Sequence, residues 1–389
     1  MSNKIYAFAP GRTELAGNHV DHQHGVAVTG SLTQGIQANV CLNNTNIIKI
    51  KSEGFEPFEV NINDIKNKEY LDNIDKFTSK SLVEGIVYSF IKRNIQISGF
   101  DAIIKSDIPS GMGLSSSAAF ELLIGVILNT AFNNNKLSKM ELAQIGHFAE
   151  VEFYGKNCGL LDQTAISYGG IIKIDFSDPD NLNVLPINFS FKDKGISAIL
   201  VNCGAEHGNI SDMYSSIPDQ MIKVANNCNV NYLNETNTKT LFKNLNNIKQ
   251  KTGQKPCCRA IHYFHEINLV KQRIKALENN DMRTFMYLHG LSGSSSAQFL
   301  QNVNIDNTQQ DATLCQAICE LALDITCNND YTNRGASRIH GGGFGGCIQI
   351  FLPHNQTREF CNIVDNVYNK TVAFNIDFSK LGAYAKFEN

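Results

Sequence analysis

The segment from Pro109 to Ala119 reads PSGMGLSSSAA and combines two glycines with three consecutive serines. It stands between an apolar run that predicts a strand, Phe100 to Ile108, and one that predicts a helix, Ala118 to Phe132. Glycine lets the backbone approach a ligand closely, and the first N–H groups of a helix lack partners within it. The segment therefore predicts a phosphate site, whose hydroxyls could also bind Mg²⁺. An ordinary glycine-rich turn capped by serine is the competing interpretation, and the Gly-Lys-Ser/Thr of a Walker A loop is absent.

Three further segments suit the same chemistry. Residues 10–22 read PGRTELAGNHVDH and gather short polar side chains on one loop after a predicted strand. Residues 158–163, CGLLDQ, place an aspartate at an expected helix start. Residues 340–347, HGGGFGGC, run directly into an apolar strand, which is atypical of a flexible linker. In this order the segments resemble the GHMP kinase superfamily. Residues 10–22 are similar to the galactokinase signature, and the resemblance covers nearly the whole chain.

The resemblance implies a kinase that uses ATP and Mg²⁺, with the Pro109–Ala119 segment around the phosphates. Ser117 would supply a hydroxyl ligand to the metal, and Glu150, within an Ala-Glu pair, a carboxylate. One or two protein oxygens suffice, because phosphates and water complete the shell of Mg²⁺. The expected nucleotide contacts are Gly111, Met112, Gly113, Leu114, Ser115, Ser116 and Ser117.

Asp162 and Arg12 are the catalytic pair that the resemblance implies. Asp162 would face the sugar hydroxyl and orient it or accept its proton. Arg12 would lower the pKa of Asp162 and stabilise the transferring phosphoryl group. Taken alone, the two would be interpreted as a turn aspartate and a surface arginine. Phosphoryl transfer needs positioning and charge neutralisation more than covalent chemistry, which suits this pair.

The sugar site is expected on the loop that follows the first strand. The substrate-binding residues that the resemblance implies are Asn18, His19, Asp21, Gly159 and Tyr214. The sequence departs from the family signature at Asn18, where the family has Glu, and at Glu14, where it has Asn. Because the family Glu lies near the C6 hydroxyl, the exchange leaves galactose, an amino sugar, a pentose and a uronic acid open as acceptors.

Hydrophobic periodicity predicts strands at residues 5–9, 26–30, 36–42 and 100–108, and long helices at 118–132 and 139–154. The second half is mostly helical. Runs of strands and runs of helices favour an α+β fold. The resemblance implies the two-domain GHMP kinase fold, with mixed sheets, helices and an active site in the cleft between the domains. We expect an N-terminal domain over residues 1–180 and a C-terminal domain over residues 181–389.

Composition excludes several classes of protein. A net charge of −3 gives no reason to expect nucleic acid or an anionic membrane as partner. A basic leader followed by an apolar run is absent, as is a long apolar span. Eleven scattered cysteines suit reduced thiols in a cytoplasmic protein. We expect a monomer or weak dimer whose partners are a monosaccharide and ATP.

The sequence thus predicts a galactokinase-type sugar-1-kinase that phosphorylates the anomeric hydroxyl of galactose. One alternative keeps the chemistry and changes the sugar. Another is a non-catalytic sugar sensor on the same scaffold. The intact Ser117, Glu150, Arg12 and Asp162 favour an enzyme, because a sensor need not keep both a metal ligand and a base.

Overall fold

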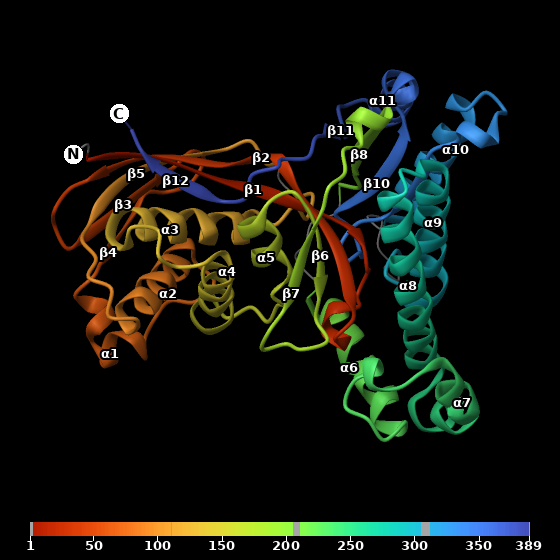
Figure 1. The fold of residues 1–389 in the computed structure, drawn as a ribbon, viewed down its shortest axis with the longest axis horizontal. Coiled ribbons are helices and arrows are strands. Elements are labelled where there is room, and N and C mark those ends of the chain that lie inside the picture. Colours follow the sequence, from red (N-terminus) through yellow and green to blue (C-terminus); the bar gives the residue numbers. More distant parts are fainter. Residues whose placement is uncertain (1–2, 110, 205–210, 305–311, 389) are drawn as a thin grey trace.

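The computed structural model describes residues 3–109, 111–204, 211–304 and 312–388. Two sheets lie side by side along the molecule, each with helices packed against it (Figure 1). Ser110, part of the expected phosphate segment, lies outside the described residues. The architecture confirms the expected α+β fold of mixed sheets and helices.

The larger sheet has eight strands, with the order β12-β1-β2-β5-β3-β4 and a branch in which β6 pairs with β2 and with β7. All its pairs are antiparallel except β3 with β5. Its strands are β1 (Lys4–Ala16), β2 (Val26–Leu42), β3 (Ile47–Ser52), β4 (Phe58–Asn61), β5 (Phe100–Ser106), β6 (Ile171–Asp175), β7 (Asn183–Ile187) and β12 (Tyr384–Phe387).

Strands β1 and β2 form one long hairpin. The sugar loop was expected within residues 10–22, but β1 extends to Ala16, so the sugar loop at the tip of the hairpin is residues 17–25 and carries Asn18, His19 and Asp21. The prediction that the first strand ends at Pro10 is wrong, because β1 continues through a register shift between Pro10 and Arg12. Likewise the expected strands at 26–30 and 36–42 are one strand, β2. A β-bulge re-aims side chains without ending a strand, and Arg12 is the first paired residue after this shift.

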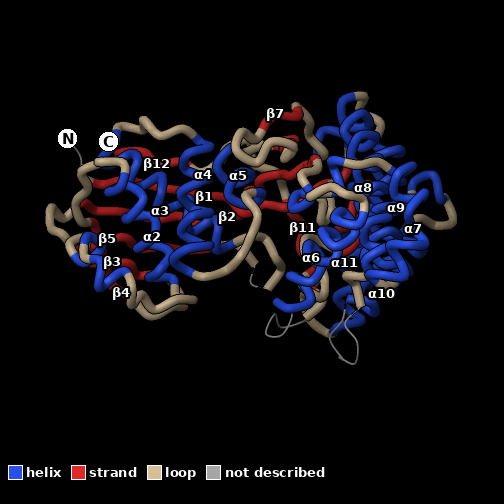
Figure 2. Tube along the Cα trace, turned by 90° about the horizontal axis from the view of Figure 1, so that it is seen from below, coloured by secondary structure: helices blue, strands red, loops and turns tan. Residues whose placement is uncertain are grey.

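Five helices cover one face of this sheet (Figures 1 and 2). They are α1 (Lys68–Leu71), α2 (Ser79–Lys92), α3 (Ser116–Asn133), α4 (Lys139–Phe148) and α5 (Leu161–Tyr168). By length and composition alone α3 could cross a membrane, but 67% of it is buried inside the protein, as in a core helix. A π-helical turn, Ala149–Tyr154, continues α4.

The smaller sheet is antiparallel, with the order β11-β8-β10-β9. Its strands are β8 (Ile196–Asn202), β9 (Ala336–Ile339), β10 (Cys347–Pro353) and β11 (Ala373–Ile376). Six helices occupy the same half of the molecule as this sheet (Figure 2). They are α6 (Ser211–Asn227), α7 (Thr238–Thr252), α8 (Gln254–Glu278), α9 (Met282–Ser295), α10 (Ala312–Thr326) and α11 (Thr357–Tyr368), and a π-helical turn, Ser296–Leu300, continues α9. Of these helices, α9, α10 and α11 contact the sheet.

The domain boundary expected at residue 180 stays a prediction. Strands β7 and β12 follow residue 180 in the chain, yet both pair within the larger sheet. The C-terminal strand therefore returns to the N-terminal half, where it lies against β1 (Figure 1).

Candidate active site

Arg12 joins three parts of the site. Its Nε and Nη2 donate to Oδ1 and Oδ2 of Asp162, each at 2.7 Å. Its Nη1 donates to the carbonyl oxygen of Gly113 at 2.6 Å. A bidentate guanidinium–carboxylate pair fixes geometry as well as charge. The structure therefore brings the two residues expected to be catalytic into direct contact, and it ties both to the phosphate segment.

The phosphate segment turns back on itself before α3. Gly111 and Gly113 have φ of 73° and 68°, a left-handed backbone that glycine adopts without strain. Ser115 also has a positive φ, 60°, and stands at the N-cap of α3. Its hydroxyl does not cap the helix but donates to Oδ2 of Asp162. The N-terminal N–H groups of α3 consequently receive no side-chain cap, which suits binding of an anion there.

Asp162 lies in the first turn of α5 with a third of its side chain exposed. Burial by itself would raise its pKa. The charge and hydrogen bonds of Arg12, with the hydroxyl of Ser115, outweigh that effect and hold the pKa of Asp162 below its ordinary value. Asp162 is thus ionised at neutral pH and presents an open side to a substrate.

Glu150 and Ser117 form the expected metal pair. Ser117 Oγ donates to Glu150 Oε1 at 3.3 Å, so two hard oxygens converge. Glu150 is buried in the π-helical turn, a feature frequent at functional sites. Its other oxygen, Oε2, accepts from Gln163 at 2.7 Å and from the thiol of Cys158 at 3.1 Å. The carboxylate is held in one orientation from both sides.

These residues fit Mg²⁺. The described part of the chain holds no cluster of three or more His, Cys, Asp or Glu side chains suited to a metal. Mg²⁺ needs no such cluster, because it takes one or two protein ligands and keeps waters or substrate phosphates. The ammonium of Lys156 stands 3.0 Å from Oε1 of Glu150 and supplies a positive charge at the same place. Sequence reasoning missed Lys156, which lies between the helix expected at 139–154 and the segment 158–163.

Asn18 is fully buried at the tip of the β1–β2 hairpin. Its Nδ2 donates to the carbonyl oxygen of Gly341 at 2.5 Å. Its Oδ1 accepts from Ser296 and from Asn302, both at 3.1 Å. The amide is thus engaged with the glycine-rich loop and with the π-helical turn and following residues after α9. A direct contact between Asn18 and a sugar stays a prediction.

The other expected sugar residues lie together. Nε2 of His19 is 3.0 Å from the carbonyl oxygen of Gly342, and the His19 ring is tilted against that of Tyr214, with centroids 5.2 Å apart. Asp21 lies so close to Gly159 that a Cβ on Gly159 would stand 2.7 Å from an Asp21 oxygen. Glycine at 159 therefore leaves space for this carboxylate beside the segment that carries Asp162.

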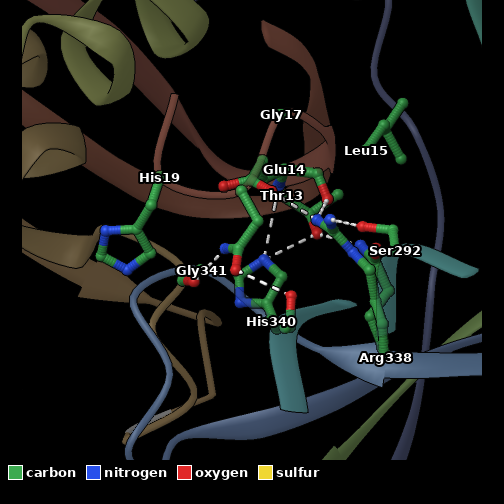
Figure 3. A network of polar contacts seen from close by, with 12 residues as sticks. Thr13, Glu14, Leu15, Gly17, His19, Ser292, Arg338, His340 and Gly341 are labelled. Atoms are coloured by element: carbon green, nitrogen blue, oxygen red, sulfur yellow. Dashed lines mark hydrogen bonds and ion pairs between the residues drawn. The ribbon is translucent and has the colours of Figure 1, made fainter. Parts of the chain in front are cut away.

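A network of buried polar side chains contacts the end of β1 and the start of the sugar loop (Figure 3). Arg338 reaches from β9 to Glu14 of β1, with 2.5 Å between Nη2 and Oε1. His340 Nε2 lies 2.9 Å from Thr13 Oγ1. Glu266 accepts from the backbone N–H of Gly17 at 3.0 Å. Glu14, which stands where the family signature has Asn, is therefore paired with a positive charge within the protein.

The glycine-rich loop, residues 340–347, lies against the phosphate segment. The thiol of Cys347 donates to the carbonyl oxygen of Met112 at 3.1 Å, which links the loop to the phosphate segment. The backbone N–H of Arg12 donates to Leu114 at 3.2 Å. Residues from four distant segments thus meet in one place.

Two protein-family models match the chain. One, described as the GHMP kinases N terminal domain, matches residues 81–170. The other, described as the galactokinase galactose-binding signature, matches residues 2–40. The chain carries a GHMP kinase N-terminal domain and a galactokinase galactose-binding signature. This confirms the family expected from the sequence.

Curated relatives match this chain over nearly its full length. A galactokinase of Lactococcus lactis subsp. cremoris is 28% identical over 383 residues, which cover 96% of this chain and 89% of the relative. A galactokinase of Clostridium tetani is 28% identical over 378 residues, which cover 95% and 90%.

Solved structures share the fold. Lactococcus lactis galactokinase complexed with galactose superposes with a TM-score of 0.78 at 23% identity, covering 99% of this chain and 95% of that one. Methanococcus jannaschii mevalonate kinase gives a TM-score of 0.64 at 16% identity, covering 97% and 98%. Both comparisons confirm the GHMP kinase fold for this chain.

Proposed function

We propose that this GHMP kinase transfers the γ-phosphoryl group of ATP to the anomeric hydroxyl of galactose. The observation that carries the proposal is the contact of Arg12 with both Asp162 and Gly113. It places a carboxylate suited to a sugar hydroxyl beside a turn suited to phosphate. The galactokinase relatives and the match to the galactose-binding signature support galactose as the acceptor.

The roles of the residues follow from charge. Asp162 accepts a hydrogen bond from the attacking hydroxyl and orients it. Because Arg12 keeps the pKa of Asp162 low, this carboxylate is a weak base. It takes the proton when the forming bond to phosphorus has made the hydroxyl acidic. Arg12 and the N-terminus of α3 stabilise the negative charge of the transferring group.

Ser117 and Glu150 would hold Mg²⁺, which when bound neutralises charge on the β- and γ-phosphates. The chain's own part is to keep the two oxygens fixed. Gln163 and Cys158 restrain the far oxygen of Glu150, and the near oxygen stays on the side of Ser117. Expected nucleotide contacts from Gly111 to Ser117 remain part of this proposal.

The case for another sugar rested on Asn18 and Glu14. Both are engaged within the protein, Asn18 with the glycine-rich loop and Glu14 with Arg338. The two exchanges therefore have a structural explanation and give no direct argument for a different acceptor. A non-catalytic sensor is disfavoured, because the metal pair and the Arg12–Asp162 pair are both assembled.

The proposal is tested by coupled ADP release with galactose, galactosamine, galacturonate and arabinose. The position of the phosphate in the product is read by ³¹P and ¹H NMR. Galactose is expected to be the best acceptor and to carry the phosphate at C1. Phosphate at another carbon, or a tenfold preference for another sugar in kcat/KM, would overturn the choice of substrate.

A further inference from the structure

Lys156 follows the π-helical turn and stands beside the metal pair. Gly155 ends that turn with a φ of 93°, and the backbone N–H groups of Gly155 and Lys156 both donate to the carbonyl oxygen of Glu150. These bonds fix the start of the lysine side chain near Glu150. Its ammonium then reaches Glu150 Oε1 at 3.0 Å.

The two partners differ sharply in exposure. The Glu150 side chain is 3% exposed and that of Lys156 is 56% exposed. Glu150 also accepts from Ser117, Cys158 and Gln163, so it does not depend on lysine alone. Lys156 has a flexible four-carbon stem and room to move. A half-exposed ion pair of this kind stabilises a fold weakly, so a purely structural role explains little.

The charge of Lys156 acts on two carboxylates. Besides the contact with Glu150, it favours the ionised form of Asp162. With Ser117 and Glu150 holding the metal and Asp162 orienting the attacking hydroxyl, as proposed above, the γ-phosphoryl group of ATP would lie between Glu150 and Asp162. The ammonium is therefore beside the path of the transferring group.

We propose that Lys156 is a further catalytic residue, whose ammonium leaves Glu150 when nucleotide binds and contacts the γ-phosphoryl oxygens. This inference rests on the proposed kinase function. The move exchanges one anionic partner for another, and it would leave Glu150 Oε1 open to serve as a metal ligand. The lysine then adds a third positive group to Arg12 and the metal, and no bond to Lys156 is made or broken.

The test compares binding of ADP with binding of a non-hydrolysable β,γ-imido analogue of ATP. Calorimetry without sugar and at fixed Mg²⁺ gives both Kd values. Their ratio measures how much the γ-phosphate contributes to binding. A charge-assisted hydrogen bond contributes about 1.5–3 kcal/mol, which corresponds to about 10- to 100-fold in Kd. Lys156→Ala should weaken binding of the ATP analogue by at least about 10-fold more than binding of ADP. Lys156→Arg should restore most of the ratio.

A matched control exists on α2. Lys80 also pairs with a buried glutamate, Glu84, at 3.7 Å and with 43% of its side chain exposed. Lys80→Ala should leave the ratio of the two Kd values unchanged. If Lys156→Ala weakens both nucleotides equally, or neither, the γ-phosphate contact is refuted. Circular dichroism checks folding, and Lys156→Gln replaces the alanine variant if that fails to fold. A wild-type chain that binds neither nucleotide contradicts the kinase proposal itself.

Discussion

Arg12 meets both carboxylate oxygens of Asp162 at 2.7 Å, and the pKa of Asp162 is held below its ordinary value as a result. Ionised Asp162 is the form that can orient a sugar hydroxyl. The bidentate contact with Arg12 therefore extends activity toward low pH, because Asp162 is protonated only at a lower pH than an ordinary aspartate.

Arg12→Lys keeps the positive charge but loses the bidentate hydrogen bonds to Asp162, and Arg12→Gln loses both the charge and the bidentate contact. The pKa of Asp162 should rise in each variant, more in Arg12→Gln, so the acid limb of the rate profile should move to higher pH. Removing a preorganised donor should also lower kcat by about 10²- to 10³-fold. The profile of kcat/KM against pH measures the shift. If the acid limb of Arg12→Gln stays at the wild-type pH, the ionisation seen in the rate profile is not that of Asp162.

Ser117→Ala removes the hydroxyl that faces Glu150. The Mg²⁺ concentration at half-maximal rate should rise several-fold, because one hard oxygen ligand is lost. KM for galactose should stay within about twofold, since the sugar loop is untouched. Ser177→Ala, at an exposed serine between β6 and β7, is the comparison and should leave the Mg²⁺ midpoint in place. Equal Mg²⁺ midpoints for Ser117→Ala and wild type would mean that Ser117 is not a metal ligand.

Asn18→Asp keeps the shape of the side chain and replaces the donor that faces Gly341. A buried carboxylate would then oppose a carbonyl oxygen, which should lower the free energy of unfolding by about 1–3 kcal/mol. Urea denaturation measures the loss. The exposed Asn226 of α6 provides a control, and Asn226→Asp should change stability by less than about 0.5 kcal/mol. If Asn18→Asp is as stable as wild type, the hydrogen bond from Asn18 to the glycine-rich loop does not contribute to stability.

Several buried histidines make stability depend on pH. Burial, with the charge of His22, lowers the pKa of His19 to about 3. Burial and nearby arginines hold the pKa values of His289 and His340 well below the ordinary value. In the unfolded chain these rings titrate near 6.5, so the unfolded state binds more protons below that pH.

The free energy of unfolding should therefore be highest above about pH 6.5 and fall as pH drops toward the folded pKa values. Each such histidine contributes up to about 1.4 kcal/mol per pH unit in that window. Denaturation curves at pH 7.5, 6.5 and 5.5 test the slope. His340→Gln should reduce it, even if that variant is less stable throughout. A stability that is flat from pH 7.5 to 5.5 would mean that these rings take up protons in the folded state.

Much of the site was predictable because its chemistry is concentrated in short segments. Asp162, Arg12 and the turn at Gly113 were placed together by family resemblance, and the structure brings them into contact. The end of the first strand was predicted wrongly at Pro10, because local sequence does not reveal the bulge that lets β1 continue.

The environments of Glu14 and Lys156 could not be predicted. The partner of Glu14, Arg338, lies 324 residues away in the sequence. The residues around Glu14 therefore do not indicate that it forms a buried ion pair. Lys156 has the appearance of an ordinary exposed lysine. Its contact with Glu150 depends on the π-helical turn, whose extra residue per turn has no composition signal of its own.

The most direct measurement is galactose-dependent ADP release by wild type and by Asp162→Asn, with galactose 1-phosphate quantified in the same samples. Wild type should form ADP and galactose 1-phosphate in equal amounts. Asp162→Asn should lower kcat by about 10²-fold or more and leave binding of the ATP analogue within about threefold. Asp193→Asn, on an exposed turn, should match wild type. Near-normal turnover in Asp162→Asn, or ADP release that does not depend on galactose, would contradict a galactose kinase built on Asp162.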